Sequence, residues 1–331
     1  MGKIDFVLTW VDGEDKKWQE KRAAYDDKAE KNTNTSAQYR DYGTLKYWFR
    51  MVEKYAPWVN KIHFVTCGQK PEWLNENHPK LHLVNHTDFI EDKYLPTFSS
   101  NPIELNFHRI DGLEEQFVYF NDDTFICAPT KETDFFKNGL PCDSFEYSSL
   151  IPSVKNEAIT YILFNDLLLL NSNISKRKMM KKNLSKWLSL KYGRGFFRNL
   201  YYMPIGKFGG FVNPHLPNSF LKSTYDIVWE KEGEYLSKVC ENRFRTNEDV
   251  NQYLIRYWQL ATGQFSPRSL KIGRCFVLGV DDVAIEKSLT AKKMKLICIN
   301  DNPNAENIDQ QMQWLRNIFK DLYPEKCSFE K

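Results

Sequence analysis

Short apolar runs alternate with helical patterns through the first third of the chain. The runs IDFVLTWVDG, KIHFVTCGQ, LHLVNH and FVYF are rich in β-branched and aromatic residues, and polar residues or glycine follow most of them. The segment Tyr39 to Tyr55 places Leu45, Trp48, Phe49 and Val52 on one helical face. Strands that alternate with helices predict an α/β fold with a mainly parallel sheet flanked by helices. Neither a G-x-G-x-x-G nor a P-loop motif occurs, so the sequence does not support dinucleotide or P-loop chemistry.

A short helix is expected just before the FVYF strand. Ser99 or Ser100 can cap its first turn. Because Glu104 and His108 are four residues apart, the pattern puts them on one helical face, with Arg109 beside them. We therefore expect a histidine and an arginine to reach the same rim as the acidic residues that follow the strand.

Acidic and amide side chains follow several predicted strands. Asn121, Asp122 and Asp123 come directly after FVYF, Asp12 follows the first strand, and Asp301 follows the late strand MKLICIN. Ligands bind at the carboxyl ends of strands in open α/β sheets. Oxygen ligands of this kind hold Mg²⁺ or Mn²⁺, which grip a diphosphate. The alternative for Asp12 is a plain Asp-Gly turn residue.

Further candidates lie outside the strands. His215 stands between two prolines in a Gly- and Pro-rich loop, where functional groups are common, although an inconsequential surface histidine is the alternative. Thr246 and Asp249 fit a capping box for a helix over 244–260, and Arg245 has no such structural reason.

Arg40 and Asp41 lie just before the apolar helical face that begins at Leu45. An exposed ion pair or a cap is their default role. The alternative is that they anchor a phosphate near the start of a helix.

Charge is distributed unevenly along the 331 residues. The net charge is +3, yet between Leu167 and Tyr225 there are eleven Lys or Arg and no acidic residue. This basic middle region, with Lys181 and Lys182 in it, is expected to be a mostly helical insertion over 150–210 of a single domain, 1–331. A solvated helix face is one interpretation; an anionic membrane surface or a phosphate-rich polymer is another. Nucleic acid also suits basic and aromatic residues, but no nucleic-acid-binding motif accompanies them.

The seven cysteines are scattered without CxxC spacing, which favours a reducing compartment and gives no zinc pattern. The N-terminal residues MGKIDFVLTW contain no signal-peptide core. We expect a cytoplasmic protein, with the inner face of the cell membrane as a possible site of attachment.

Long motifs of the chain resemble those of one family. IDFVLTWVDGED resembles the first conserved region of the Stealth proteins, and RDYGTLKYWFRMVEKYAPWVNKIHFVTCGQKPEWL with LPTFSSNPIELNFHRIDGLEEQFVYFNDDTF resembles the second. NPHLPNSF with RFRTNEDVNQYL is similar to the third region, and LICINDN with LYPEKCSFE to the fourth. The family includes bacterial polysaccharide phosphotransferases and the catalytic subunit of the lysosomal-enzyme N-acetylglucosamine-1-phosphotransferase.

The resemblance implies a glycosyltransferase-A-like fold and a divalent metal, Mg²⁺ or Mn²⁺. It implies transfer of a hexose-1-phosphate from a UDP-sugar to a hydroxyl of an oligosaccharide or lipid-linked glycan, with release of UMP and no nucleic-acid partner. His215 is favoured as acid/base with His108 as the rival, and Arg245 is expected to contact the transferred phosphate. The catalytic set is His215, Arg245, His108, Asp123 and Asp249, and the metal set is Asp122, Asp123 and Asp301. The substrate-binding set is Asp12, Arg40, Asp41, Asn101, Arg109, Asn121, Lys181 and Lys182.

Two other functions remain open at this point. A metal-dependent glycosyltransferase with the same fold would attack the anomeric carbon and release UDP. A non-catalytic protein could bind glycans or polyanions through the basic middle region.

Overall fold

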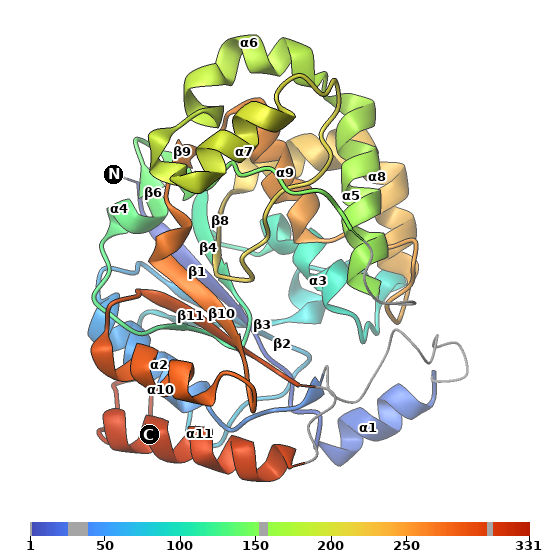
Figure 1. Ribbon diagram of the computed structural model, residues 1–331. Coiled ribbons are helices and arrows are strands. Elements are labelled where there is room, and N and C mark those ends of the chain that lie inside the picture. Colours follow the sequence, from blue (N-terminus) through green and yellow to red (C-terminus); the bar gives the residue numbers. More distant parts are fainter. Residues whose placement is uncertain (1, 26–38, 152–157, 303–306) are drawn as a thin grey trace.

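The computed structural model describes residues 2–25, 39–151, 158–302 and 307–331 (Figure 1). A five-stranded sheet lies at its centre in the order β3-β2-β1-β4-β8. The first four strands are parallel, and the fifth runs antiparallel to β4. Their bounds are β3 (Leu81–Asn85), β2 (Ile62–Thr66), β1 (Ile4–Thr9), β4 (Gln116–Phe120) and β8 (Asn218–Leu221). The predicted α/β class with a mainly parallel sheet flanked by helices is thus confirmed.

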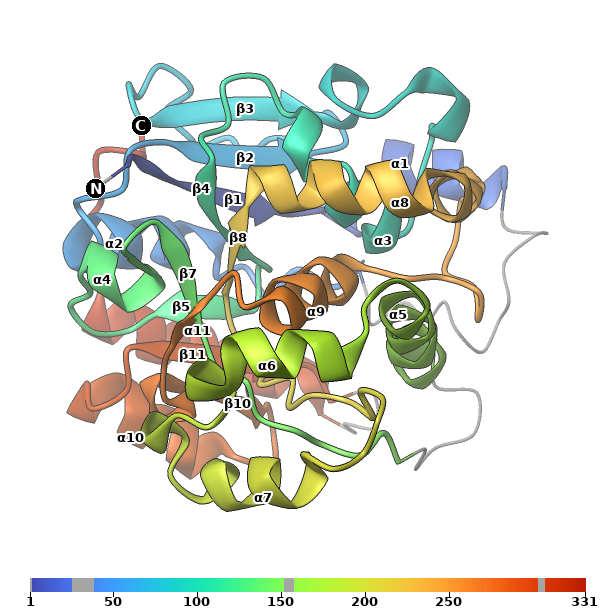
Figure 2. The same cartoon turned by 90° about the horizontal axis from the view of Figure 1, so that it is seen from above.

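Both faces of this sheet are buried, because side chains of β1 alternate between two apolar clusters. Ile4, Phe6 and Leu8 join one cluster, and Val7 joins the other. Helices α2 (Leu45–Tyr55) and α11 (Ile308–Leu322) contribute to the first cluster. The second contains side chains of α3 (Ser100–Leu105), α8 (Lys222–Glu241) and α9 (Gln252–Thr262). Figure 2 shows the two groups of helices on either side of the sheet.

Two three-stranded sheets accompany the central sheet. One has the order β10-β11-β5, with β10 (Gly273–Val277) parallel and β5 (Thr124–Ile126) antiparallel to β11 (Leu296–Asn300). The other has the order β6-β7-β9. The strands of the second sheet are β6 (Phe136–Lys137), β7 (Leu140–Asp143) and β9 (Ser266–Pro267). Three further helices are α1 (Lys16–Ala23), α4 (Glu132–Phe135) and α10 (Asp282–Ala291).

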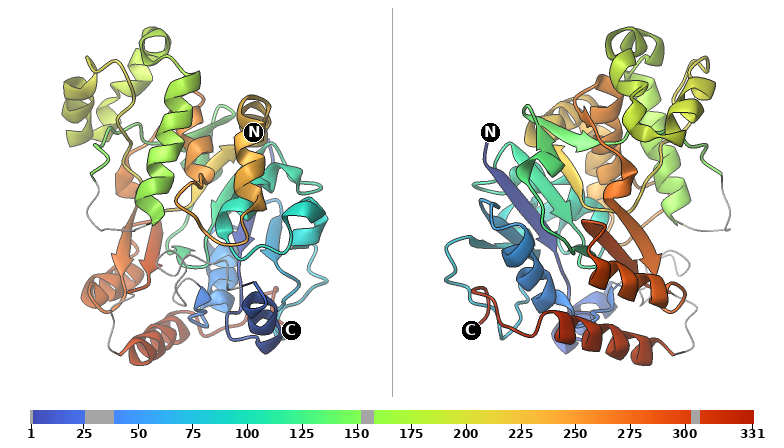
Figure 3. Two further views of the ribbon diagram at one scale, coloured as in Figure 1. Left: turned by 90° about the vertical axis from the view of Figure 1, so that its right-hand side faces the viewer. Right: turned by 60° about the vertical axis from the view of Figure 1, so that its left-hand side comes forward.

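The basic middle region carries three helices, α5 (Ala158–Asn173), α6 (Lys176–Trp187) and α7 (Arg194–Tyr202). In Figure 3 they gather at the end of the molecule opposite α11. Trp187 is fully buried against Phe145, so this region shares the second apolar cluster. Within the described ranges, no helix combines the length and apolar character needed to cross a bilayer.

Three helix boundaries differ from the sequence-based expectation, the first being that α2 begins at Leu45 and not near Tyr39. Ser99 caps α3 as predicted, since its side chain accepts a hydrogen bond from the Asn101 amide. The helix ends at Leu105, however, and a separate 3₁₀ turn covers Phe107–Arg109. Glu104 and His108 therefore do not share a helix face, and that prediction was wrong.

The helix expected over 244–260 begins at Gln252, where the Asn251 side chain caps it. The Thr246 amide does donate to Asp249 at 3.0 Å, but this pair closes a turn ahead of the helix. The capping-box motif was recognised correctly and assigned to the wrong element.

A buried carboxylate fixes the amino-terminal end of the central sheet. Asp5 is fully buried on β1 and accepts hydrogen bonds from Asn60 Nδ2 at 2.7 Å and the Glu114 amide at 3.0 Å. Its other contact is His63 Nε2 at 3.0 Å on β2. One side chain thus ties β1 to the loop before β2 and to the loop before β4.

We expect Asp5→Ala to lower the free energy of unfolding by about 3 kcal/mol, because it leaves several buried polar groups without partners. Urea denaturation measures this change. Asp226→Ala, at an exposed position on α8, is the control and should shift the free energy by less than about 0.5 kcal/mol. Equal effects of the two substitutions would contradict the role given to Asp5.

Candidate active site

A cavity of about 670 Å³ opens at the carboxyl ends of β1 and β4. This volume is in the range of sites for small ligands. Residues from segments far apart in the sequence line it, and nine of them are predicted site residues. These are Arg40, Asp41, Asn101, Asn121, Asp122, Asp123, His215, Arg245 and Asp301.

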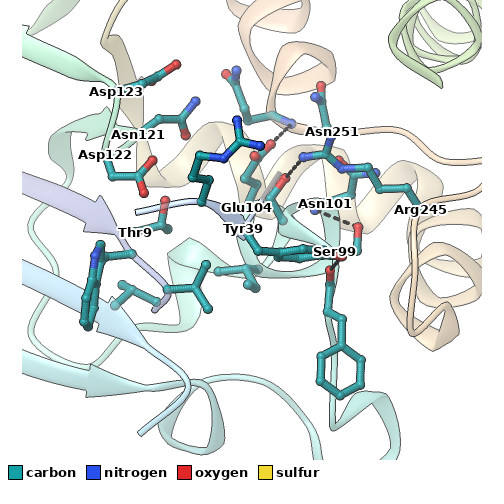
Figure 4. A pocket seen from close by; sticks show the side chains of 18 of the residues that line it. Thr9, Tyr39, Ser99, Asn101, Glu104, Asn121, Asp122, Asp123, Arg245 and Asn251 are labelled. Carbon is teal, nitrogen blue, oxygen red and sulfur yellow. Dashed lines mark hydrogen bonds between the residues drawn. The ribbon is translucent and has the colours of Figure 1, made fainter. Parts of the chain in front are cut away.

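The acidic side of the cavity starts where β4 ends. The carbonyl of Asn121 accepts hydrogen bonds from the amide and the hydroxyl of Thr124, which turns the chain into β5. Asp122 and Asp123 lie in this turn and project toward the cavity (Figure 4). Burial raises the pKa of Asp122 to about 8, and the negative charges of Asp123 and Asp41 add to the effect. The site therefore holds a carboxyl group that gains charge near neutral pH.

Asp301 brings a third carboxylate from the end of β11. Arg40 Nη1 contacts its Oδ2 at 2.5 Å, so residues 261 positions apart form an ion pair inside the cavity. Neighbouring Asp41 accepts a hydrogen bond from the Gly43 amide at 2.8 Å, and burial raises its pKa.

These carboxylates fit the predicted divalent cation in one respect and not in another. Asp123 Oδ1 and Asp301 Oδ1 are buried without a hydrogen-bond partner among the described residues, as oxygens reserved for a cation would be. In the described part of the chain, however, Asp122, Asp123 and Asp301 do not gather closely enough to form a protein-only cage. Mg²⁺ commonly uses one or two carboxylates together with water and substrate phosphates, and this arrangement suits that mode.

His215 reaches the acidic side from the Gly- and Pro-rich loop. Its backbone has φ +49°, a region that costs energy for a residue with a side chain. Its Nε2 lies 3.7 Å from Asp123 Oδ2. Burial lowers the pKa of His215, but the charge of Asp123 and a hydrogen bond with Cys275 outweigh it, and the pKa is raised to about 9. His215 is thus an imidazolium ion at neutral pH.

Arg245 and Glu104 form the other side of the cavity (Figure 4). Arg245 Nη2 donates to Ser100 Oγ at 3.0 Å. Glu104 accepts from Tyr119 Oη at 3.3 Å and from the Gln252 amide at 3.4 Å. Burial raises the pKa of Glu104, and the positive charge of Arg245 opposes that rise.

Glu104 was not among the predicted site residues, although it lies three positions after Asn101 on the helix that the sequence identified. Because Glu104 and Asn101 are three residues apart on one helix, the predicted role of Asn101 could have indicated that Glu104 also faces the site. Asn213, Asn251 and Gln252 also line the cavity and were not among the predicted site residues, although they lie in the motifs NPHLPNSF and RFRTNEDVNQYL.

Asp249 supports the site from behind the cavity wall. It is fully buried and accepts hydrogen bonds from Asn101 Nδ2 at 2.7 Å and Asn242 Nδ2 at 3.0 Å. Since Asn101 lines the cavity and Asp249 does not, Asp249 acts as a positioning residue.

His108 and Arg109 lie outside the cavity, contrary to the expectation that they would reach its rim. The ring of His108 packs against Tyr225 and Trp229 of α8, and burial lowers its pKa to about 3. Arg109 pairs with Glu91 at 2.8 Å. The break after Leu105 turns both side chains away from the acidic residues.

Three more predicted residues do not line the cavity. Asp12 closes the turn after β1, where its Oδ1 accepts from the Glu14 amide at 2.9 Å, as the alternative interpretation had it. Lys181 and Lys182 are exposed on α6.

The raised pKa of Asp122 predicts that stability depends on pH. Its raised pKa means that folding becomes less favourable as pH rises from about 4, where the unfolded group ionises, to about 8. Because the side chain is partly exposed, solvent screening limits the effect, and we expect Asp122→Asn to raise the free energy of unfolding at pH 8 by about 1 kcal/mol. At pH 4 the variant should match the parent protein. Chemical denaturation at both pH values measures this difference, and a gain that does not depend on pH would contradict the assignment.

Comparisons with known proteins identify the family. The model of Stealth protein conserved region 1 matches residues 2–30, and that of conserved region 2 matches residues 38–144. Among solved structures, the WbbM bifunctional glycosyltransferase matches 98% of this chain and 52% of its own, with a TM-score of 0.37 and 12% identity, a likeness too distant to argue from.

Curated relatives match over the whole length. The capsular polysaccharide phosphotransferase WcwK of Streptococcus pneumoniae is 42% identical over 333 residues, covering 100% of this chain and 99% of the relative. The receptor polysaccharide phosphotransferase WefC of Streptococcus gordonii is 42% identical, covering 99% of both chains. The exopolysaccharide phosphotransferase cps2G of Lactiplantibacillus plantarum is 38% identical, covering 99% and 96%. The chain therefore belongs to the Stealth family and is an enzyme of the phosphotransferase type.

Proposed function

We propose that this phosphotransferase of polysaccharide biosynthesis moves a hexose-1-phosphate from a UDP-sugar to a hydroxyl of a glycan acceptor and releases UMP. The observation that carries the proposal is the meeting of Arg40, Arg245 and His215 with three carboxylates in one cavity of about 670 Å³. A diphosphate is an anion that needs cationic side chains and, commonly, a divalent metal. The names of the relatives support transfer of a phosphate-containing group to a polysaccharide.

The donor's diphosphate belongs at the acidic side of the cavity in this proposal. Asp122, Asp123 and Asp301 would hold Mg²⁺ or Mn²⁺ there, and the bound cation would neutralise charge on the leaving phosphate. Arg40 is already oriented by Asp301 and can contact a phosphate oxygen from the same side.

The transferred phosphoryl group faces Arg245. Its guanidinium is oriented by Ser100 and by the buried Glu104, so it needs little reorganisation when charge develops. The acceptor oxygen attacks the β-phosphorus, a new P–O bond forms, and the bond from this phosphorus to the oxygen of UMP breaks.

Proton transfer falls to the pair Asp123 and His215. The Asp123 carboxylate accepts the proton of the acceptor hydroxyl, and the His215 imidazolium gives a proton to the departing UMP oxygen. Because Asp123 Oδ2 and His215 Nε2 are 3.7 Å apart, a proton passing between them restores the starting state. The proposal therefore keeps His215 as the acid/base, in line with the sequence-based preference, because His215 lines the cavity and His108 does not.

We expect His215→Ala to lower kcat by about 100-fold or more, because the proton donor is lost. The control is His108→Gln, which changes the rival histidine outside the cavity and should leave kcat within about threefold. Steady-state kinetics with purified proteins measure both values. A larger loss in His108→Gln than in His215→Ala would reverse the assignment.

The nucleotide product separates the two enzyme classes. Incubation with a UDP-sugar, Mg²⁺ and a glycan acceptor should yield UMP, because the β-phosphorus is the centre attacked. Release of UDP in step with glycan formation would instead establish a glycosyltransferase. Liquid chromatography of the nucleotides over a panel of UDP-sugars distinguishes these results and identifies the donor hexose.

Helix α7 presents an exposed apolar face that could contact a membrane carrying the acceptor. On α7 the apolar side chains Phe197, Leu200 and Tyr201 are spaced as one helical face, and all three are exposed. Phe197 and Tyr201 are 71% and 77% exposed, and the basic residue Arg194, one helical turn before Phe197, is exposed as well. An apolar face with basic neighbours is typical of helices that lie on anionic bilayers. We propose that α7 carries the enzyme to a lipid-linked acceptor.

We expect the double substitution Phe197→Ser with Tyr201→Ser to reduce sedimentation with anionic phospholipid vesicles by about tenfold, because both apolar contacts with the bilayer are lost. Hydrolysis of the UDP-sugar should be unaffected. Val283→Ser, which removes an equally exposed apolar side chain on α10, is the control and should bind vesicles like the parent. Unchanged sedimentation of the double variant would exclude α7 as the membrane contact.

A further inference from the structure

Two cysteines meet the active-site histidine at the edge of the cavity. Cys275 lies on β10 directly opposite Cys298 on β11, and their Sγ atoms are 3.3 Å apart. One ligand atom from each of Cys275, Cys298 and His215 lies within 4.8 Å of the other two. Neither the proton transfer nor the contacts with phosphate proposed above uses the two thiols.

Sheet register fixes this cluster. Cys298 is paired with Cys275 on one side and with Thr124 of β5 on the other, and Asp123 directly precedes Thr124. The Ile299 amide donates to the Asp123 carbonyl at 2.9 Å, which holds Asp123 beside β11. Cys298 Sγ consequently lies 3.3 Å from Asp123 Oδ2. Three donor residues are thus held by backbone hydrogen bonds, and the strained loop at His215 supplies the fourth.

The spacing agrees with a tetrahedral metal site. With Zn–S bonds of about 2.3 Å, two thiolates on one zinc ion lie roughly 3.8 Å apart, about half an ångström more than in the empty cluster. Two sulfurs and one imidazole are soft donors that prefer zinc and its chemical relatives to Mg²⁺. The Asp123 carboxylate or a water molecule can take the fourth position.

We propose that Cys275, Cys298 and His215 form a binding site for a thiophilic divalent cation such as Zn²⁺, and that its occupancy inhibits the enzyme. Inhibition rests on the proposed function, because a metal bound to His215 removes the proton donor. Binding itself does not depend on that function. Zinc would therefore act as a regulatory ligand at this site.

Titration of the reduced, metal-free protein with Co²⁺ tests binding directly. The parent protein should bind one equivalent and show thiolate-to-cobalt charge-transfer absorption, and Cys275→Ser and Cys298→Ser should each weaken binding at least about tenfold. Cys67→Ser is the matched control, because Cys67 is a partly exposed thiol lining the same cavity outside the cluster. Thermal unfolding verifies folding, and Cys275→Ala replaces any variant that does not fold.

To test inhibition, enzyme activity is measured at increasing Zn²⁺ concentrations in the presence of a constant excess of Mg²⁺. The parent and Cys67→Ser should lose activity together, and Cys275→Ser should need about ten times more Zn²⁺ relative to its own uninhibited rate. Absence of thiolate absorption in the parent, or Co²⁺ titrations of the two cluster variants that match the titration of the parent, would overturn the site. Cobalt binding without zinc inhibition would overturn the regulatory part alone. Because the absorption needs no sugar donor, failure of the phosphotransfer assay would not affect the binding result.

Discussion

Parallel pairing of β1 with both β2 and β4 is the constraint on which the cavity depends. The register sets Leu8 of β1 opposite Phe64 and Phe120, so the three strands end at one edge. Cavity residues follow each of the three strands: Trp10 and Val11 after β1, Cys67 after β2 and Asn121–Asp123 after β4. A slip of one residue would turn the buried side chains of β1 to the opposite faces of the sheet. The buried anchor at Asp5 makes such a slip costly.

Opposite charges balance one another across this cavity. Arg40 pairs with Asp301, His215 lies beside Asp123, and the charge of Arg245 opposes the pKa rise of buried Glu104. At Asp122 the charges of Asp123 and Asp41 instead add to the effect of burial, and its pKa is raised to about 8. A carboxyl group that resists ionisation in the empty site gives up its proton when a cation arrives. Burying these ionisable groups lowers the stability of the fold, which is typical of functional sites.

The sequence was sufficient for much of this arrangement. Periodicity identified β1 to β4, β11 and α2, but not β8, which begins inside the predicted Gly- and Pro-rich loop. The Asn-Asp-Asp run marked the end of β4, and the family motifs predicted that His215 and Arg245 belong to the same site. Local helical spacing failed at His108, because the chain leaves the helix at Leu105 and begins a 3₁₀ turn. The sequence was compatible with Asp12 either as a site residue or as a turn residue, and in the structure Asp12 is a turn residue.

Long-range pairings could not be read from the sequence. The contact of Arg40 with Asp301 joins residues 261 positions apart, and no local pattern links them. The cysteines looked scattered because metal-binding spacing is usually sought within one segment, whereas strand register brings Cys275 and Cys298 together. Glu104 was noticed for its helical spacing, but its burial beside Arg245 depends on α9 and on the turn before it.

The central claim is that the acceptor attacks phosphorus and not carbon. A UDP-sugar that carries a radiolabel in its β-phosphate tests this claim directly. Attack at phosphorus transfers the labelled phosphate to the glycan, whereas attack at the anomeric carbon leaves it in UDP. We predict that the label appears in the glycan, in a phosphodiester that resists phosphatase treatment. Recovery of the label in UDP, with an unlabelled glycan product, would contradict the account.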